Sequence, residues 1–392
     1  MSVGATSLEP VASLQLAPVD LLIFQGTPFC NIDCRYCYLP NRSDRSRLEL
    51  ETVRRACVQL KSSELVAANL AVLWHAGEPL VLPPVFYERA FDAIENVLGT
   101  AVEQRIQTNA TLINDTWIKL FRERQVSIGV SLDGPAWLHD ANRRTRSGKA
   151  TSSRVLDSVR RLKDAGLPLN IICVLTAEHL ARPQELFAFF EELGVNRLSF
   201  NIDEPGGPYL QSSHVDAVTK SSFREFLVHY FRLVKLHNSH QVVRELERGL
   251  QYVFARRVGP GTECVPIRNL TVGHDGGFST LSPELHGLSH PLFGPFNLGN
   301  VYDKDPFGAL AENSRLLAMM TSIEAGMHLC RGACGYFEIC GGGLPANKLA
   351  EHATFEATET TACKFKRQAV ADAVVEILTS TEPSAELRPM HS

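Results

Sequence analysis

The chain has 392 residues, enough for roughly two or three domains. Hydrophobic residues make up 44% and charged residues 21% of it, which are ordinary proportions for a globular protein. A formal net charge of −4 argues against a protein that holds nucleic acid through bulk positive charge. No apolar run reaches the ~18 residues of a membrane helix, and no secretion signal is present at the N-terminus. We therefore expect a cytoplasmic protein that binds neither nucleic acid nor a membrane.

Short apolar runs alternate with longer amphipathic runs after residues 1–18, which we expect to be a loose leader segment. Alternating strands and helices imply a parallel sheet with right-handed crossovers. The predicted strands lie at 20–25, 70–75, 105–109, 126–133, 169–175 and 197–203. The predicted helices lie at 48–62, 83–98, 114–124, 151–165 and 180–193, and Asn114 is the expected N-cap of the third.

Six strands are fewer than the eight of a closed barrel, so the sequence predicts an open, partial (β/α)6 barrel over 19–208. Its chemistry is expected at the C-terminal ends of the strands, where the strand-to-helix loops converge. The rest of the chain is expected to divide into a helical linker, a Cys-rich domain and a flexible tail, over 209–258, 259–378 and 379–392. Within them the predicted helices are 220–237, 241–258 and 364–378. The stretch 259–343 is rich in Gly and Pro and is expected to lack long helices. It therefore needs a stabilising crosslink, such as a disulfide or a bound metal.

Ten cysteines are present, and without a secretion signal disulfides are the weaker explanation for them. Cys57 and Cys173 stand alone in apolar stretches and are predicted to be small core residues. Cys30, Cys34 and Cys37 follow the first strand with the spacing C-x3-C-x2-C. Three thiolates can hold three irons of a [4Fe–4S] cluster and leave the fourth iron open. A structural zinc site would need a fourth ligand, and none is nearby.

This spacing, after the first strand of a βα pattern, resembles the radical SAM superfamily. The resemblance implies that the open iron binds S-adenosylmethionine, whose reductive cleavage yields a 5′-deoxyadenosyl radical that abstracts a hydrogen atom. Matching motifs end the next three predicted strands: HAGEP at 75–79, QTN at 107–109 and SLDGP at 131–135. By resemblance, six residues contact bound S-adenosylmethionine at its methionyl ammonium, methionyl carboxylate, ribose and adenine. They are Tyr36, Gly77, Glu78, Asn109, Ser131 and Arg143.

A second group, Cys330, Cys334, Cys340 and Cys363, has the spacing C-x3-C-x5-C-x22-C. Four thiolates form a closed site for zinc or for a fully ligated [4Fe–4S] cluster, and the spacing alone does not choose between them. The group resembles the C-terminal domain of SPASM-type radical SAM enzymes, which holds two auxiliary [4Fe–4S] clusters. The four cysteines then correspond to the ligands of the outer cluster.

The chain departs from that pattern at the inner auxiliary cluster. Leu344 stands where a cysteine is expected, and Leu281 and Ser282 stand where another is expected. Only Cys264 remains of the inner set, so we expect one auxiliary cluster, with Cys264 as a free thiol, a spare ligand or a substrate contact. The catalytic base of such enzymes has no firm match either. The candidates are Asp275, Glu284 and Cys264.

The strings CYLP at 37–40, HAGEPL at 75–80 and YFEICGGGLPANK at 336–348 are similar to GrrM/OscB-type peptide maturases. Such enzymes act on ribosomally made precursor peptides and form cyclophane crosslinks, and close relatives form side-chain cyclopropanes. The resemblance implies a precursor peptide as substrate and an external flavodoxin- or ferredoxin-type electron donor. A sulfatase-maturating, formylglycine-forming enzyme is the alternative, and the missing inner ligands count against it. A second alternative is a non-catalytic iron–sulfur scaffold protein, and the intact SAM motifs count against this alternative.

Overall fold

The computed structural model describes residues 13–100, 102–214, 218–254 and 261–380. The expected leader up to residue 12 and the expected tail from 381 onward lie outside the described residues. Residues 13–18 are not loose, because Leu14 N donates a hydrogen bond to Ala311 O at 2.8 Å. Among the described helices, none has the length and apolar character needed to cross a membrane.

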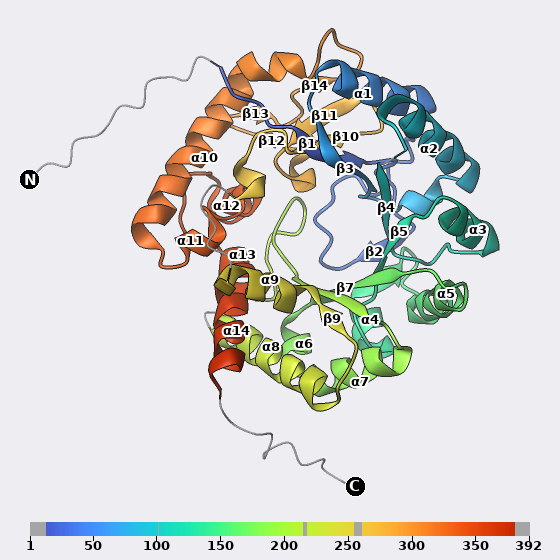
Figure 1. Ribbon diagram of the computed structural model, residues 1–392, viewed down its shortest axis with the longest axis vertical. Coiled ribbons are helices and arrows are strands. Elements are labelled where there is room, and N and C mark those ends of the chain that lie inside the picture. The colour runs from blue at the N-terminus through green and yellow to red at the C-terminus, as the bar shows by residue number, and fades with distance from the viewer. Residues whose placement is uncertain (1–12, 101, 215–217, 255–260, 381–392) are drawn as a thin grey trace, which may run out of the picture.

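All six predicted strands are present, and they pair in parallel in chain order. Most of their apolar side chains are buried, and others, such as those of Ile172 and Val174, are partly exposed. They are β1 (Val19–Phe24), β3 (Val66–Trp74), β4 (Glu103–Thr108), β5 (Ser127–Ser131), β7 (Leu169–Leu175) and β8 (Arg197–Ile202). The strands form an arc with the connecting helices along its outer side (Figure 1).

The connecting helices follow the predicted ranges closely. They are α1 (Leu50–Ser62), α2 (Pro84–Leu98), α3 (Asp115–Glu123), α4 (Ala136–Asn142), α5 (Ser152–Asp164), α6 (Ala177–Leu180) and α7 (Pro183–Leu193). Asn114 caps α3, because its side-chain oxygen accepts a hydrogen bond from Trp117 N at 3.2 Å. The helix predicted over 180–193 is present as α7, but it begins three residues later than predicted, at Pro183. Pro183 disfavours helical geometry in the residue before it, so α6 ends at Leu180 and α7 begins anew.

The sheet has ten strands, because further strands extend both edges of the arc. At one edge β9 (Val242–Val243) pairs in parallel with β8, so the helix predicted over 241–258 instead begins as a strand and continues as α9 (Arg244–Phe254). At the other edge β10 (Asn269–Val272) pairs in parallel with β1, followed by antiparallel β11 (Gly277–Thr280) and β14 (Gly299–Asn300). The sheet therefore runs across the boundary expected at 258.

Two small antiparallel pairs lie outside the main sheet. They are β2 (Ile32–Cys34) with β6 (Arg143–Thr145), and β12 (Ser289–His290) with β13 (Gly294–Pro295). The α-helices of the second half are α8 (Val218–Leu236), α10 (Ser314–Ala333), α11 (Phe337–Cys340), α12 (Pro345–His352), α13 (Thr361–Cys363) and α14 (Val370–Thr379), with a π-helical segment, Lys364–Ala369, before α14. Short 3-10 helices lie at Pro79–Val81, Thr262–Cys264, Pro283–Leu285 and Gly308–Glu312.

The expectation that 259–343 lacks long helices is wrong, because α10 has 20 residues. Asn313 caps it by accepting a hydrogen bond from Leu316 N at 3.0 Å. One of the two glycines inside this helix reflects close packing: a Cβ at Gly326 would lie 2.1 Å from Phe355 O. This glycine marks the approach of another backbone, whereas the sequence suggested a helix-poor region.

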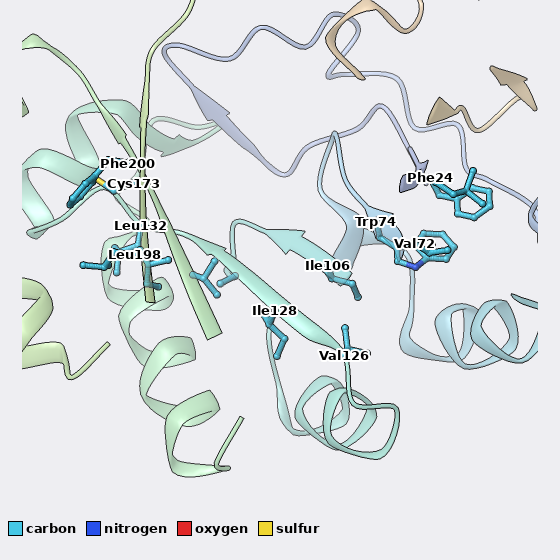
Figure 2. Packing of buried hydrophobic residues seen from close by; sticks show 14 of the residues in the cluster. Phe24, Val72, Trp74, Ile106, Val126, Ile128, Leu132, Cys173, Leu198 and Phe200 are labelled. Carbon is cyan, nitrogen blue, oxygen red and sulfur yellow. The ribbon is translucent and has the colours of Figure 1, made fainter. Parts of the chain in front are cut away.

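The core of the barrel lies between the sheet and its outer helices (Figure 2). Trp74 of β3 is fully buried and stacks on Phe24 of β1 with ring centroids 5.0 Å apart. Cys173 pairs with Phe200 across β7 and β8 and is fully buried, as is Cys57 on α1. The prediction that these two cysteines belong to the core is confirmed.

We expect Cys57→Ala and Cys173→Ala each to lower the free energy of unfolding by about 1–2 kcal/mol, because each leaves a small cavity in packed surroundings. Denaturant unfolding and iron analysis together provide the test. Iron content should equal that of the wild type in both variants, and a loss of iron from either would contradict their assignment to the core.

Candidate functional site

The first cysteine group lies on the loop that leaves β1 and crosses the C-terminal ends of the neighbouring strands. The loop is fixed by its backbone: Cys30 N donates to Arg42 O at 3.2 Å, and Arg146 donates to Cys30 O at 3.0 Å. Cys34 lies on β2, opposite Arg143 on β6. The cysteines are therefore held at the strand edge where the sequence pattern predicts the chemistry.

The end of β3 packs directly against this loop. Gly77 has φ +60°, and a Cβ there would lie 2.2 Å from Thr27 O and 2.7 Å from Phe29 O. Glu78 N then donates to Phe29 O at 2.9 Å. Only glycine fits at this contact, which explains its place in the HAGEP stretch.

Glu78 joins the ends of β3 and β4. Its buried carboxylate accepts hydrogen bonds from Thr108 Oγ1 at 2.6 Å, Asn109 N at 2.8 Å and Leu80 N at 3.0 Å. Burial nevertheless raises its pKa to about 6. The Asn109 side chain continues toward the cysteine loop, with Nδ2 2.9 Å from Asn31 Oδ1 and 3.8 Å from Cys30 Sγ. Glu78 thus positions Asn109 beside the cysteine loop, a role that the motif alone does not reveal.

Asp133, at the end of β5, is the central acceptor of the site and is fully buried. It accepts hydrogen bonds from Tyr36 Oη, from Arg143 Nε at 2.9 Å and from Val174 N at 3.0 Å. Burial opposes its ionisation, but the Arg143 guanidinium holds its pKa below the usual range. Asp133 therefore fixes Tyr36 and Arg143 to the barrel.

Arg143 is buried between this carboxylate and the cysteine loop. Its Nη1 lies 3.8 Å from Cys34 Sγ, and its guanidinium lies 5.3 Å from the centroid of the Tyr36 ring. Within the described residues, its Nη2 donates no hydrogen bond. Ser131 stands one strand position before the turn and accepts a hydrogen bond from Gln107 Nε2 at 3.0 Å. The structure thus brings the six residues assigned by resemblance to one strand edge around the three cysteines.

The thiols fit a cationic cluster. Burial raises the pKa of Cys34 to about 12, and burial together with the charge of Glu78 raises the pKa of Cys30 further. Cys37 lies near enough that its charge adds to both effects. Burial raises the pKa of the core thiol Cys57 in the same way, so the fit to a cluster rests on the three thiols that one loop carries at the strand edge.

The second cysteine group gathers where α10, α11 and α13 end. Cys340 lies close enough to Cys330 and Cys363 that its charge raises the pKa of both thiols, after the larger effect of burial. Cys334 caps α10 and acts on Cys330 in the same way. Cys264 is buried beside them, with Sγ 3.5 Å from Gly343 O, and the charges of Cys340 and Cys330 act on its pKa. The four predicted ligands and Cys264 therefore share one region.

The candidate bases occupy different places. Asp275 lies in the turn between β10 and β11, where its Oδ1 accepts a hydrogen bond from Gly277 N at 2.9 Å. Glu284 follows β11 and lies near Tyr38, which stands next to Cys37. Burial, with the nearby charges of Glu263 and Glu204, raises the pKa of Glu284 to about 7. Glu284 is thus the candidate that combines a place near the first cysteine loop with a pKa near neutrality.

Two features of the site were not predicted from the sequence. Tyr38 Oη lies 3.3 Å from His75 Nε2, and burial lowers the pKa of that histidine to about 4. Lys348 on α12 is buried and reaches Cys330 Sγ at 3.3 Å. Lys348 ends the string YFEICGGGLPANK at 336–348, so the sequence does place a lysine near Cys340. Its burial was not predicted, because lysines are mostly exposed.

Comparison with known proteins identifies the family. The radical SAM superfamily model matches residues 24–190. An uncharacterized protein of Synechocystis sp., sll1766, is 34% identical over 376 residues, which cover 94% of both chains. The chain belongs to the radical SAM superfamily. A serine-type anaerobic sulfatase-maturating enzyme of Bacteroides thetaiotaomicron is 24% identical over 382 residues, 92% of this chain and 89% of that protein.

Solved structures share the fold across both halves of this radical SAM chain. Native anSMEcpe with bound AdoMet and Cp18Cys peptide matches with a TM-score of 0.75 at 19% identity, over 92% of this chain and 98% of that one. Streptococcus suis SuiB bound to the precursor peptide SuiA matches with a TM-score of 0.66 at 18% identity, over 89% and 76%. Membership of the superfamily implies a [4Fe–4S] cluster and S-adenosylmethionine, and the thiols of the first loop fit such a cluster.

We expect Arg143→Lys to weaken SAM binding with little change in iron content. Lysine keeps the charge beside Asp133 but loses the planar fork that grips a carboxylate with two donors. Equilibrium binding of SAM to the reconstituted protein measures the effect, and Arg144→Lys, one position along β6 with an exposed side chain, is the control. Unchanged SAM affinity in Arg143→Lys would remove Arg143 from the cofactor site.

Proposed function

We propose that this enzyme modifies a ribosomally made precursor peptide. It removes a hydrogen atom from an sp3 carbon of the peptide and then forms a carbon–carbon bond oxidatively, as a cyclophane crosslink or a side-chain cyclopropane. The observation that carries the proposal is in the C-terminal half, where Cys330, Cys340 and Cys363 lie near enough for their charges to interact and Cys334 acts on Cys330. Enzymes with the same fold are known in complexes with the Cp18Cys and SuiA peptides, which supports a peptide substrate.

One auxiliary cluster is part of the proposal, with Cys330, Cys334, Cys340 and Cys363 as its ligands. A second set of four thiols is not available among the described residues, because Leu344 is the N-cap of α12 and Leu281 is 1% exposed in the apolar core. We further propose that residues 19–208 hold the first cluster and SAM, and that 259–378 hold the auxiliary cluster.

The first cluster and SAM, when bound, supply the 5′-deoxyadenosyl radical, and an auxiliary cluster supplies an acceptor for the electron that the peptide gives up. The peptide then loses a second hydrogen as a proton, and we assign its removal to Glu284. Its carboxylate lies near Tyr38 and is half ionised near neutral pH, so it can accept that proton. Asp133 and Glu78 accept hydrogen bonds from Arg143 and Asn109 and so hold them in place. The electron that reduces the first cluster comes from an external flavodoxin- or ferredoxin-type donor.

Mass spectrometry of a short peptide encoded beside the gene, coexpressed with the enzyme, tests this function. A carbon–carbon bond gives a loss of two hydrogens that fragmentation places between two residues or within one aliphatic side chain. A product that a hydrazide probe captures is an aldehyde. That result would favour the alternative, a formylglycine-forming sulfatase-maturating enzyme, to which the relative of Bacteroides thetaiotaomicron points.

The proposed ligand sets predict iron content. Two [4Fe–4S] clusters give about eight irons per chain, since each cube has four. A variant in which Cys30, Cys34 and Cys37 are all Ala should retain about four irons and lose SAM cleavage. Iron analysis after anaerobic reconstitution measures the number of clusters. About twelve irons per chain would show that other groups complete an inner auxiliary site.

Glu284 predicts a pH dependence. Its pKa is raised from the ordinary value of 4.5 to about 7, so the base is protonated below that pH and ionised above it. Peptide turnover should therefore rise as the pH increases through about 7 and then level off. Glu284→Gln should reduce turnover by about 100-fold or more and abolish this rise, whereas Asp275→Asn should keep it. A wild-type rise that persists in Glu284→Gln would assign the proton transfer to another group.

A further inference from the structure

Lys348 is a buried positive charge that the proposed reaction does not yet use. It lies on α12 with 3% of its surface exposed. Its ammonium donates to Gly326 O at 3.1 Å and to Cys330 Sγ at 3.3 Å. Among the described residues, no carboxylate lies within ion-pair distance of it, whereas Lys220, Lys364 and Lys366 each pair with one.

A buried ammonium needs a negative partner, because a carbonyl oxygen compensates only part of the lost hydration. The sulfur atoms around Lys348 are the available partners. Cys330 Sγ is in contact with the ammonium at 3.3 Å, and Cys264 lies within the range of its charge. The charge of Lys348 is therefore placed to balance negative sulfur at the second cysteine group.

The surrounding backbone fixes the ammonium at this place. Gly326 of α10 supplies the carbonyl acceptor, and its missing side chain leaves room for the lysine: a Cβ there would lie 3.2 Å from Nζ. The stem passes Gly343, whose Cβ would lie 3.5 Å from Cε. At the preceding position of α12, Asn347 Nδ2 donates a hydrogen bond to Glu204 Oε2 at 2.7 Å, which holds the start of the helix against the segment after β8.

We infer that Lys348 raises the reduction potential of the auxiliary cluster by donating an N–H···S hydrogen bond to its ligand Cys330. A hydrogen bond and a positive charge at a ligand sulfur stabilise the reduced cluster, which carries one more negative charge. Lys348 is then a positioning residue for electron transfer: it makes the cluster a better acceptor for the electron that leaves the substrate. This inference rests on the proposed single auxiliary cluster.

The test uses the full chain with Cys30, Cys34 and Cys37 changed to Ala, so that only the auxiliary cluster contributes to the signal. Its midpoint potential is measured by redox titration monitored by electron paramagnetic resonance. Lys348→Met should shift the potential to a more negative value, and Lys348→Arg, which keeps a charged donor, should remain near the parent. The matched control is Lys364→Met, next to Cys363. It removes the same charge from a side chain that is 42% exposed and paired with Glu359, where water and salt screen it.

A shift in Lys348→Met no larger than that in Lys364→Met would overturn the inference. If Lys348→Met fails to fold or to bind iron, the parent protein labelled with 15N-lysine provides a second measurement. Pulsed electron paramagnetic resonance should detect a lysine 15N coupled to the reduced cluster, and its absence would also overturn the inference. A parent without any cluster refutes the proposed auxiliary site itself, and the role of Lys348 with it, whereas a normal cluster without a shift refutes only the role of Lys348.

Discussion

The buried ion pair between Asp133 and Arg143 holds the candidate site together. The carboxylate accepts donors from the cysteine loop, from β6 and from β7, three segments that are far apart in the sequence. Removing one partner of a buried pair leaves the other charge uncompensated, which typically costs about 3–5 kcal/mol. The pair therefore adds little net stability, and its main effect is to constrain the geometry of the site. While it is intact, it fixes the positions of Tyr36 and Cys34 relative to the end of β5.

The barrel half could be predicted from sequence because its signals are local. Apolar runs define the six strands, and parallel strands bring residues at their ends together whatever the details of the loops. The strand pattern alone is therefore enough to predict that Gly77, Asn109 and Ser131 meet at one edge, whereas Arg143 was placed there by the resemblance to radical SAM enzymes. The partners of those residues were not predictable in the same way. That Glu78 would bind the backbone of Asn109, and Asp133 that of Val174, depends on loop geometry that the motifs do not encode.

The second half was predicted less well because its contacts are mostly non-local. A short run such as 269–272 has no periodicity of its own and becomes β10 only because the edge of β1 is there to pair with it. The Gly- and Pro-rich composition of 259–343 suggested a region without long helices, although Gly326 of α10 marks close approach to Phe355. The burial of Lys348 was not predicted from the sequence, and in the structure this lysine packs against Gly326 of α10 and Gly343.

The pairing of β1 with β10 also bears on how the chain folds as it is synthesised. β1 is synthesised before the other described strands, and one of its edges gains a partner only when residues 269–272 emerge, more than 240 residues later. Until then an apolar strand with unpaired backbone groups is available to other chains, which is the situation that favours aggregation. The cysteine loop follows this strand directly. The same late pairing that completes the sheet therefore steadies the loop, so iron incorporated after β10 has docked meets a loop whose base is already fixed.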